Sequence, residues 1–445
     1  MTGQPFGAMG HLLVFIRADG GVREICKEER ELKMADISEL RKAIREFRCH
    51  EKSAESAVNL VPSENKMSPL ASMPLGSDYY NRYFFNDALD PDFWQFRGGQ
   101  AAAELETGLA VRSLARLGRA PYVNVRPISG MSAMMIAMAG LGGEPGGTVV
   151  SVDAASGGHY ATADLALRLG FASATVPVAQ GRVDEVRLER ALRERAPKLV
   201  YLDLQNSRHE LQVSRVAELI AAHSPRTLLH VDCSHTLGLV LGGALENPLD
   251  AGADTMGGST HKSFPGPHKG VLFTRSGEMH RKLRDAQFKM LSSHHFAETL
   301  ALGLAASEFL HFGQAYAEQL IGNAQLFSKL LGAEGFDVVT DDDGHATSTH
   351  QVWVKIGNAA RTDSLSRALY DHGIRVNVQV DLPGVPGPLL RLGVSEFTFL
   401  GGREAAVHAL VKEFGNARSD IRRDGKGSLR VREQYGPPHY FADLP

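Results

Sequence analysis

The sequence predicts an α/β fold, with a large domain built on a mostly parallel sheet and a smaller α/β domain toward the C-terminus. Three observations predict it. The chain has 445 residues, which is more than one ordinary hydrophobic core accommodates. Between residues 120 and 300, short apolar runs that end in polar residues alternate with helix-forming segments. Beyond a long predicted helix at 315–335, there is a second and shorter alternation.

The strands of the large domain are predicted from continuous apolar runs, because strands buried on both faces of a parallel sheet lack polar alternation. They comprise residues 148–152, 198–204, 228–233 and 270–274, and a further apolar run from Asp254 onward. Helices are predicted between them, for example at 183–195 and 213–223. Ligands of such sheets bind beyond the carboxyl ends of the strands, so the polar residues there are the first candidates for chemistry.

The chain is predicted to divide into an N-terminal extension with a helical arm (1–75), a large cofactor-binding domain (76–320) and a small C-terminal domain with a surface tail (321–445). In the last of these, strands are expected at 351–356 and 389–394, and helices at 364–372 and 404–414.

The first 33 residues differ in pattern from the rest of the chain, and two interpretations stand side by side. The apolar run at 12–16 either forms an extra edge strand, or the start codon has been read too far upstream. From Asp36, which is placed to cap it, an amphipathic helix is predicted. Its apolar face comprises Ile37, Leu40, Ile44 and Phe47.

The bulk composition excludes several classes of function. A formal charge of -3 without long charged blocks does not suggest binding to nucleic acid or to an anionic membrane. No apolar stretch reaches the roughly 18 residues that span a bilayer. The cysteines, Cys26, Cys49 and Cys233, make no disulfide framework, and a reducing cytoplasmic compartment is expected. No cluster with metal-ligand spacing is found, so no metal is expected.

The most informative segment is Gly257–Pro267, in which Lys262 stands between glycine and proline turns after an apolar strand. Lysine forms Schiff bases with carbonyl cofactors, and burial favours the neutral amine that attacks. The hydroxyls of Ser259 and Thr260 are candidates for binding a phosphate. The plainer interpretation, an ordinary lysine on a surface loop, stays open from this segment alone.

The second segment places Asp232 at the end of the predicted strand 228–233. A buried acid is costly unless it meets a positive partner. In pyridoxal chemistry that partner is the protonated ring nitrogen, which must stay charged for the ring to accept electrons. Seen alone, such an aspartate is more often a helix cap or a metal ligand. Its pairing with Lys262, thirty positions later, favours the cofactor.

Two further segments fit the same ligand. Ser129, Gly130 and Met131 open a helix of small residues, and the backbone N–H groups of a helix N-terminus bind phosphate. His159 comes after a strand and a pair of glycines, where its ring can stack on a flat cofactor. Each feature alone is weak, because Ser-Gly before a helix is often a cap and a lone histidine is often structural.

Together these segments resemble serine hydroxymethyltransferase, a fold-type I pyridoxal-phosphate enzyme with an aspartate-aminotransferase-like fold. The resemblance covers residues 36–415 and includes Leu60–Asn65, which is similar to the family's substrate-binding segment, and Arg391, which is similarly placed to the family's carboxylate-binding arginine. It implies that Lys262 is the Schiff-base lysine, that Asp232 pairs with the pyridinium nitrogen, and that His159 stacks on the ring.

The resemblance also implies the remaining site residues. His235 would contact the phenolic side of the cofactor, Ser129, Gly130 and Met131 would hold the phosphate, and Thr260 and His261 would border the cofactor beside Lys262. Ser63 and Arg391 would bind the amino acid. The family forms obligate homodimers with shared sites, so Tyr83 would reach the neighbouring subunit's site.

Departures from the family pattern change the expected reaction. Phe85 stands where the family has a glutamate that serves folate chemistry, Arg97 replaces a tyrosine, and 291–295 replaces a glycine-rich loop. These changes, with 93–96, 263–270 and 349–352, resemble the L-threonine transaldolases of natural-product pathways. Such enzymes release acetaldehyde from L-threonine and add the glycyl unit to another aldehyde, which gives a β-hydroxy-α-amino acid.

Three functions therefore stay in view. The first is an L-threonine transaldolase acting on an amino acid and an aldehyde. The second is a hydroxymethyltransferase that uses tetrahydrofolate or acts on a substituted serine. The third is a catalytically silent protein that binds pyridoxal phosphate or a partner, against which the intact Lys262–Asp232 pair argues. Cleavage needs a base for the β-hydroxyl, and His159, His235 and a bound water all remain candidates.

Overall fold

The computed structural model describes residues 22–83, 96–291, 293, 295–419 and 425–442, with the side chains of 22–36 and of Arg97 left out. The chain forms two compact units, Met1–Ser56 and Ala57–Pro445. The apolar run at 12–16 and the departures at Phe85, 93–95 and His294 lie outside the described residues.

The first unit contributes helix α1 (Val22–Ser56). The prediction that a helix begins at Asp36 is wrong, because Asp36 lies inside α1. The charged residues that precede it are good helix formers, so the helix continues through them without a cap. The predicted apolar face at 37–47 lies along α1, and its four side chains are exposed.

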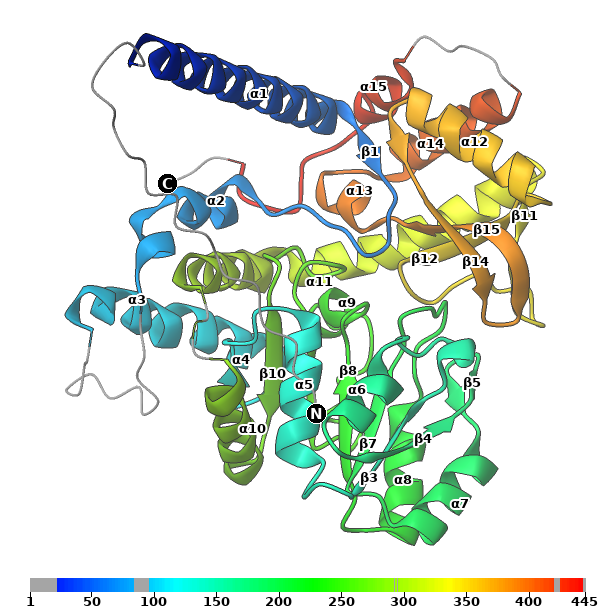
Figure 1. Cartoon of the computed structure of the whole chain (residues 1–445). Helices are drawn as coiled ribbons and strands as arrows, with labels where there is room; N and C mark the ends of the chain where they lie inside the picture. The colour runs from blue at the N-terminus through cyan, green and yellow to red at the C-terminus, as the bar shows by residue number, and fades with distance from the viewer. Residues whose placement is uncertain (1–21, 84–95, 292, 294, 420–424, 443–445) are drawn as a thin grey trace, which may run out of the picture. The chain divides into compact units, whose positions relative to one another are not determined.

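The second unit is centred on a seven-stranded sheet (Figure 1). In spatial order its strands are β2 (Tyr122–Asn124), β10 (Gly270–Thr274), β9 (Thr255–Ser259), β8 (Leu228–Asp232), β7 (Leu199–Asp203), β3 (Thr148–Val152) and β4 (Ala172–Val176). The neighbours from β9 to β4 pair in parallel, and β10 is antiparallel to both of its neighbours. The prediction of a mostly parallel sheet is confirmed.

Successive residues of a strand face opposite sides of the sheet, and β7 shows this alternation clearly. Leu199 and Tyr201 belong to the core beneath α5 (Gly130–Leu141) and α10 (Gly277–Met290). Val200 and Leu202 belong to the larger core on the other face, beneath α8 (Val213–His223) and α11 (Phe296–Ala333). By the same alternation, Asp203 at the end of β7 points to the α5 side.

A second sheet of four antiparallel strands lies in the C-terminal part of the chain. Its order is β11 (Asp337–Val338), β12 (Gln351–Lys355), β15 (Val385–Gly393) and β14 (Asn377–Leu382). Helices α11, α12 (Ala359–Asp371) and α14 (Glu404–Arg418) pack against this part. Helix α11 runs through residue 320 and therefore spans the predicted boundary at 321. The domain boundaries at 76 and 321 stay a prediction.

The segment after α1 is tied to the C-terminal part of the chain. Strand β1 (Val58–Asn59) pairs in parallel with β13 (Ile374–Arg375), and Gly393 N donates to Leu60 O at 2.8 Å. The tail, predicted to cover the surface, contains α15 (Gly427–Arg432), whose Val431 is fully buried.

The remaining elements are shorter and connect or cover these layers. They are α2 (Pro69–Ser72), η1 (Met73–Gly76), η2 (Asp78–Asn81), η3 (Arg97–Gly99), α3 (Gln100–Leu105), the π-helix η4 (Glu106–Val111), α4 (Arg112–Gly118), η5 (Ala154–Ser156), α6 (Thr162–Arg168), β5 (Val178–Ala179), β6 (Arg182–Val183), α7 (Glu185–Arg195), α9 (Leu237–Leu241) and α13 (Ser395–Phe399).

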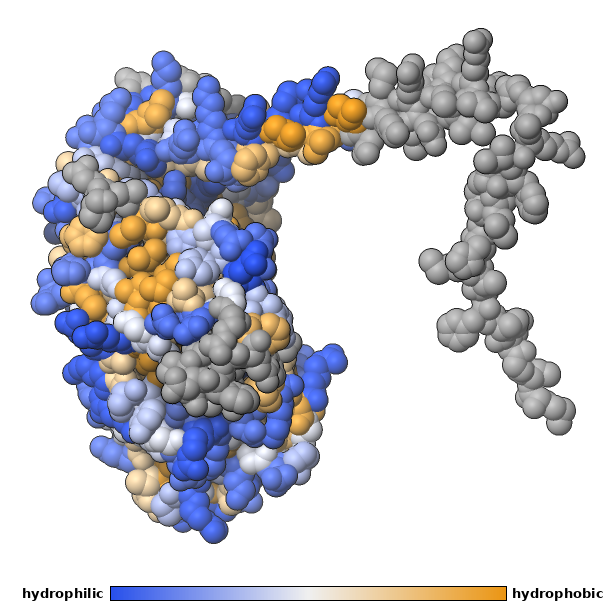
Figure 2. Space-filling model, turned by 90° about the vertical axis from the view of Figure 1, so that its left-hand side faces the viewer, coloured by the Kyte–Doolittle hydropathy of each residue, from blue (hydrophilic) through white to orange (hydrophobic). Residues whose placement is uncertain are grey.

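The surface drawn in Figure 2 is dominated by hydrophilic residues, with hydrophobic patches set among them. Among the described residues, no helix combines the length and the apolar character needed to cross a bilayer.

Candidate active site

The carboxyl ends of β7, β8 and β9 and the N-terminus of α5 meet around one cavity, here called the central cavity. Nine of the residues predicted from the sequence line it. They are Ser129, Gly130, Met131, His159, Asp232, His235, Ser259, His261 and Lys262. Met134, Asp203, Leu204, Gln205 and Ser234 complete its wall.

The α5 end of the central cavity is built to receive an anion. Ser132 N donates to Ser129 Oγ at 3.1 Å and Ser129 N donates to Ser132 Oγ at 2.9 Å, which fixes the first turn of the helix. The N–H groups of a first turn have no partner within the helix and favour negative charge. A Cβ on Gly130 would overlap the Ser259 hydroxyl, so only glycine permits this close approach. These groups fit a phosphate.

Asp232 is held rigidly at the end of β8. Ser234 N donates to its Oδ1 at 2.7 Å, and the Tyr201 hydroxyl donates to its Oδ2 at 2.7 Å. Burial, reinforced by the charge of Asp232, raises the pKa of Tyr201 well above its usual range, so this hydroxyl keeps its proton and remains a donor. The carboxylate therefore has a fixed orientation toward a positive partner.

Lys262 lines the central cavity and belongs to the segment after β9. Burial lowers its pKa to about 8, against the opposing charge of Asp232. The neutral fraction of the amine at neutral pH is therefore far larger than for an exposed lysine, and covalent attachment to a carbonyl requires the neutral form. Asn65 Nδ2 donates to Lys262 O at 2.7 Å, so the predicted segment 60–65 supports the lysine's backbone.

His159 and Asp203 form a connected pair on the α5 side of the sheet. His159 N donates to Asp203 Oδ2 at 3.1 Å, and burial lowers the pKa of the His159 ring, which is therefore neutral at neutral pH. Asp203 was not predicted from the sequence. Its signal was present, since the strand predicted at 198–204 carries an acid at its end as the strand at 228–233 does.

Arg391 lies on β15, and its side chain contacts His235. Its Nε donates to Gln351 Oε1 at 3.1 Å and its Nη2 donates to Gln205 O at 2.6 Å. Burial lowers its pKa to about 10, so the guanidinium stays charged at neutral pH. Because a guanidinium only donates, its 3.4 Å contact with His235 Nε2 places the proton of a neutral His235 on Nδ1.

Four predicted residues lie outside the lining of the central cavity, and Arg391 is one of them. The buried Thr260 hydroxyl donates to Pro267 O at 2.6 Å, so this oxygen is engaged by its own loop. Ser63 is half-buried and Tyr83 is exposed, with its ring edge-on to Phe96 at 5.1 Å between centroids. The roles implied for all four stay predictions. His261, within the lining, stacks on His268 at 3.8 Å.

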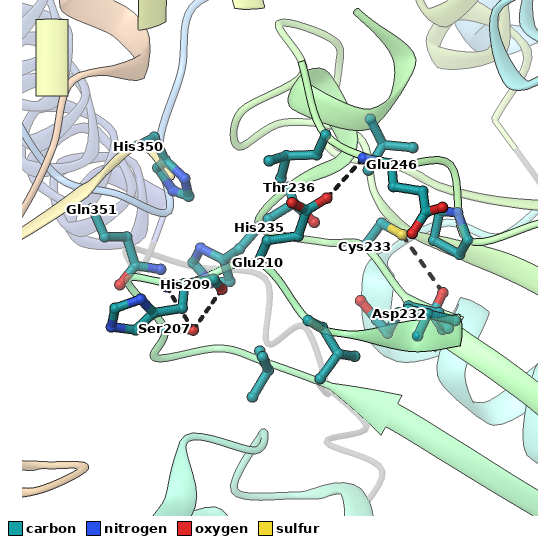
Figure 3. A pocket seen from close by; sticks show the side chains of 17 residues that line it. Ser207, His209, Glu210, Asp232, Cys233, His235, Thr236, Glu246, His350 and Gln351 are labelled. Atoms are coloured by element: carbon teal, nitrogen blue, oxygen red, sulfur yellow. Dashed lines mark hydrogen bonds between the residues drawn. The ribbon is translucent and has the colours of Figure 1, made fainter. Parts of the chain in front are cut away.

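A neighbouring cavity shares Leu204, Asp232 and His235 with the central cavity. Figure 3 shows it between His350 and Gln351 on one side and Glu246 on the other, where Glu246 N donates to Glu210 Oε1 at 2.7 Å. Lys262 does not line it. Within the described residues no group of three or more potential ligands is arranged to hold a metal ion.

Comparison with known proteins gives consistent findings. A sequence profile of serine hydroxymethyltransferase matches residues 33–411. L-threonine:uridine-5'-aldehyde transaldolases from an Amycolatopsis and a Streptomyces species are each 74% identical to this chain, covering 93% and 92% of it and 100% of their own lengths. The crystal structure of L-threonine transaldolase from Pseudomonas fluorescens, in its internal aldimine state, is similar with a TM-score of 0.77 and 25% identity, over 91% of this chain and 92% of that one.

Proposed function

Because the chain belongs to the serine hydroxymethyltransferase family, we propose that it is a pyridoxal-phosphate-dependent L-threonine transaldolase. The donor is L-threonine, the released product is acetaldehyde, and the acceptor is a nucleoside 5'-aldehyde of the uridine type named for its relatives. The observation that carries this proposal is the placement of Lys262 and Asp232 on one cavity wall, with a phosphate-type cradle at its α5 end.

The residues of the central cavity fit pyridoxal phosphate. The first turn of α5 would hold the phosphate, Lys262 Nζ would bind the aldehyde carbon, and Asp232 would face the ring nitrogen. Buried polar atoms without a partner among the described residues, such as His235 Nδ1 and His261 Nδ1, are consistent with a polar ligand here. When bound, the cofactor supplies an electron sink for the bond that breaks at the amino acid's α-carbon.

This chain's own residues bind and orient the donor and move its proton. Arg391 would pair with the carboxylate of L-threonine through Nη1, because its Nε and Nη2 already donate to Gln351 and Gln205. The β-hydroxyl must lose a proton as the Cα–Cβ bond breaks, but the ring nitrogen of His235 that accepts hydrogen bonds already faces Arg391. His159 Nδ1 likewise accepts from Ala161 N at 3.3 Å. The accepting nitrogens of both histidines are therefore already engaged. Of the three candidate bases predicted from the sequence, this favours a bound water as the group that takes the proton.

A homodimer with shared sites belongs to the same proposal. Tyr83 and Phe96 form an exposed aromatic pair that a second copy of the chain would cover. The proposed dimer is checked by light scattering of the purified protein, and a monomer with full activity would contradict it.

The decisive experiment supplies L-threonine and uridine-5'-aldehyde to the purified protein with pyridoxal phosphate and without folate. We expect acetaldehyde release, measured with a coupled dehydrogenase, and a β-hydroxy-α-amino acid product detected by mass. Folate-dependent cleavage of serine, with no reaction of threonine, would instead support the hydroxymethyltransferase. A cofactor spectrum that neither amino acid changes would exclude both enzymes.

Arg391→Lys is expected to raise KM for L-threonine by roughly 10- to 150-fold, because lysine cannot keep the bonds to Gln351 and Gln205 that hold the guanidinium in place for the carboxylate. Rates of acetaldehyde release at varied L-threonine concentration measure the effect. Arg208→Lys is the matched control: Arg208 is also buried, but it bonds to Val339 O and Ala346 O away from the central cavity. Equal KM values in the Arg391 variant and the wild type would remove Arg391 from the substrate site.

A further inference from the structure

The central cavity holds two acids, of which the family resemblance assigns only Asp232. Asp203 ends β7 as Asp232 ends β8, and the two residues are direct partners in the parallel ladder. Neighbouring strands lie about 4.8 Å apart, and both side chains point to the α5 side. Both residues line the central cavity. The two carboxyl groups therefore share one desolvated site.

The bonds of the two acids differ. Both oxygens of Asp232 accept a hydrogen bond, from Ser234 N and from the Tyr201 hydroxyl. Only Oδ2 of Asp203 is used, and it accepts from His159 N at 3.1 Å and from Thr162 Oγ1 at 2.5 Å. Asp203 Oδ1 is buried and has no partner among the described residues.

Two adjacent buried carboxyl groups ionise one after the other, since the first negative charge disfavours the second ionisation. Burial, with the charge of Asp232 adding to it, raises the pKa of Asp203 to about 7 against the Thr162 hydrogen bond. The other titratable groups that face Asp203 are Tyr201 on its own strand, Lys262 after β9 and His159 after β3. Because Oδ2 is occupied as a double acceptor, the proton of the neutral acid resides on Oδ1.

We propose that Asp203 is a positioning residue of the cofactor site, which fixes the His159 backbone through Oδ2 and carries a proton on Oδ1, so that Asp232 is the single negative charge at this end of the cavity. This inference rests on the proposed cofactor site. Ionised Asp203 raises the pKa of Lys262, so a neutral Asp203 keeps that amine available for attachment.

The pH dependence of cofactor attachment tests this role. Wild-type apo protein, Asp203→Asn and Asp203→Ala are mixed with pyridoxal phosphate between pH 5.5 and 9, and absorbance records the rate at which Lys262 is modified. Wild-type Asp203 loses its proton above about pH 7, whereas an asparagine stays neutral at every pH. Asp203→Asn should therefore match the wild type near pH 6 and diverge from it above pH 7, with a midpoint of attachment lower by about half to one pH unit. Asp203→Ala loses the acceptor for His159 N, and its dissociation constant for the cofactor should rise about tenfold.

Asp254→Asn is the matched control. Asp254 is a partly buried acid at the opposite end of the same sheet, where it accepts from Leu229 N at 2.8 Å and its pKa is also raised by burial. Its variant should keep the wild-type midpoint. An Asp203→Asn profile that superimposes on the wild type, or tenfold weaker binding in Asp203→Asn at every pH, would overturn the inference. Failure of the wild type itself to attach pyridoxal phosphate would instead refute the proposed function.

Discussion

Replacing Lys262 by alanine is expected to abolish the absorbance band of the bound cofactor and to lower the rate of acetaldehyde release by at least about 10³-fold. The reason is that Lys262 supplies the primary amine on the wall of the central cavity. Without it pyridoxal phosphate would be held only by hydrogen bonds and stacking, and the described residues that line the central cavity include no second lysine to exchange with the amino group of L-threonine. The measurement is an absorbance spectrum of the purified variant together with a coupled assay of acetaldehyde.

Lys269 provides a stringent control for this result. It is fully buried, seven positions along the chain, and burial likewise lowers its pKa to about 8. It does not line the central cavity. Lys269→Met should therefore keep the cofactor band, even if its melting temperature falls. A band retained in Lys262→Ala and lost in Lys269→Met would move the attachment site to the second lysine.

The elements that sequence reasoning predicted well are those with the plainest apolar patterns. Strands β3 and β10 and helix α8 have the predicted bounds, because a fully buried run and a regular amphipathic period are each hard to mistake. The prediction at 315–335 found only the second half of α11. Its first half is rich in Ala and Leu on every face, so it shows no period even though it is one continuous helix.

The residues of the site likewise divide into those that the sequence predicts and those that it does not. Lys262 and Asp232 were predicted because each follows an apolar strand and the two together fit a pyridoxal cofactor, although neither segment is decisive alone. Asp203 was missed because its meaning comes from register: only the pairing of β7 with β8 shows that it shares a cavity with Asp232. Glu106 and Arg126, a buried ion pair at 3.1 Å, were missed for a related reason, since twenty positions separate them and a π-helix carries the glutamate.

Asp232→Asn is expected to lower the rate of L-threonine cleavage by about 10²- to 10⁴-fold, the range that corresponds to breaking a buried charge pair. The asparagine keeps the size and the bond to Ser234 N but carries no charge to hold a proton on the ring nitrogen. Cofactor attachment through Lys262 should persist, so the loss should fall on the chemical step and leave the bound fraction of cofactor nearly complete. Single-turnover kinetics monitored by absorbance separate these two quantities.

Comparison with Asp203→Asn shows whether the loss of activity in Asp232→Asn comes from the lost charge or from altered packing. If Asp203 is already neutral, as its contacts favour, Asp203→Asn should cleave L-threonine within a few-fold of the wild type near pH 6, whereas Asp232→Asn should fail at every pH. The two variants make the same chemical change on neighbouring strands, so packing alone predicts similar losses for both. Cleavage by Asp232→Asn at close to the wild-type rate would mean that the ring nitrogen needs no buried anion, and the assignment of Asp232 as its partner would have to be abandoned.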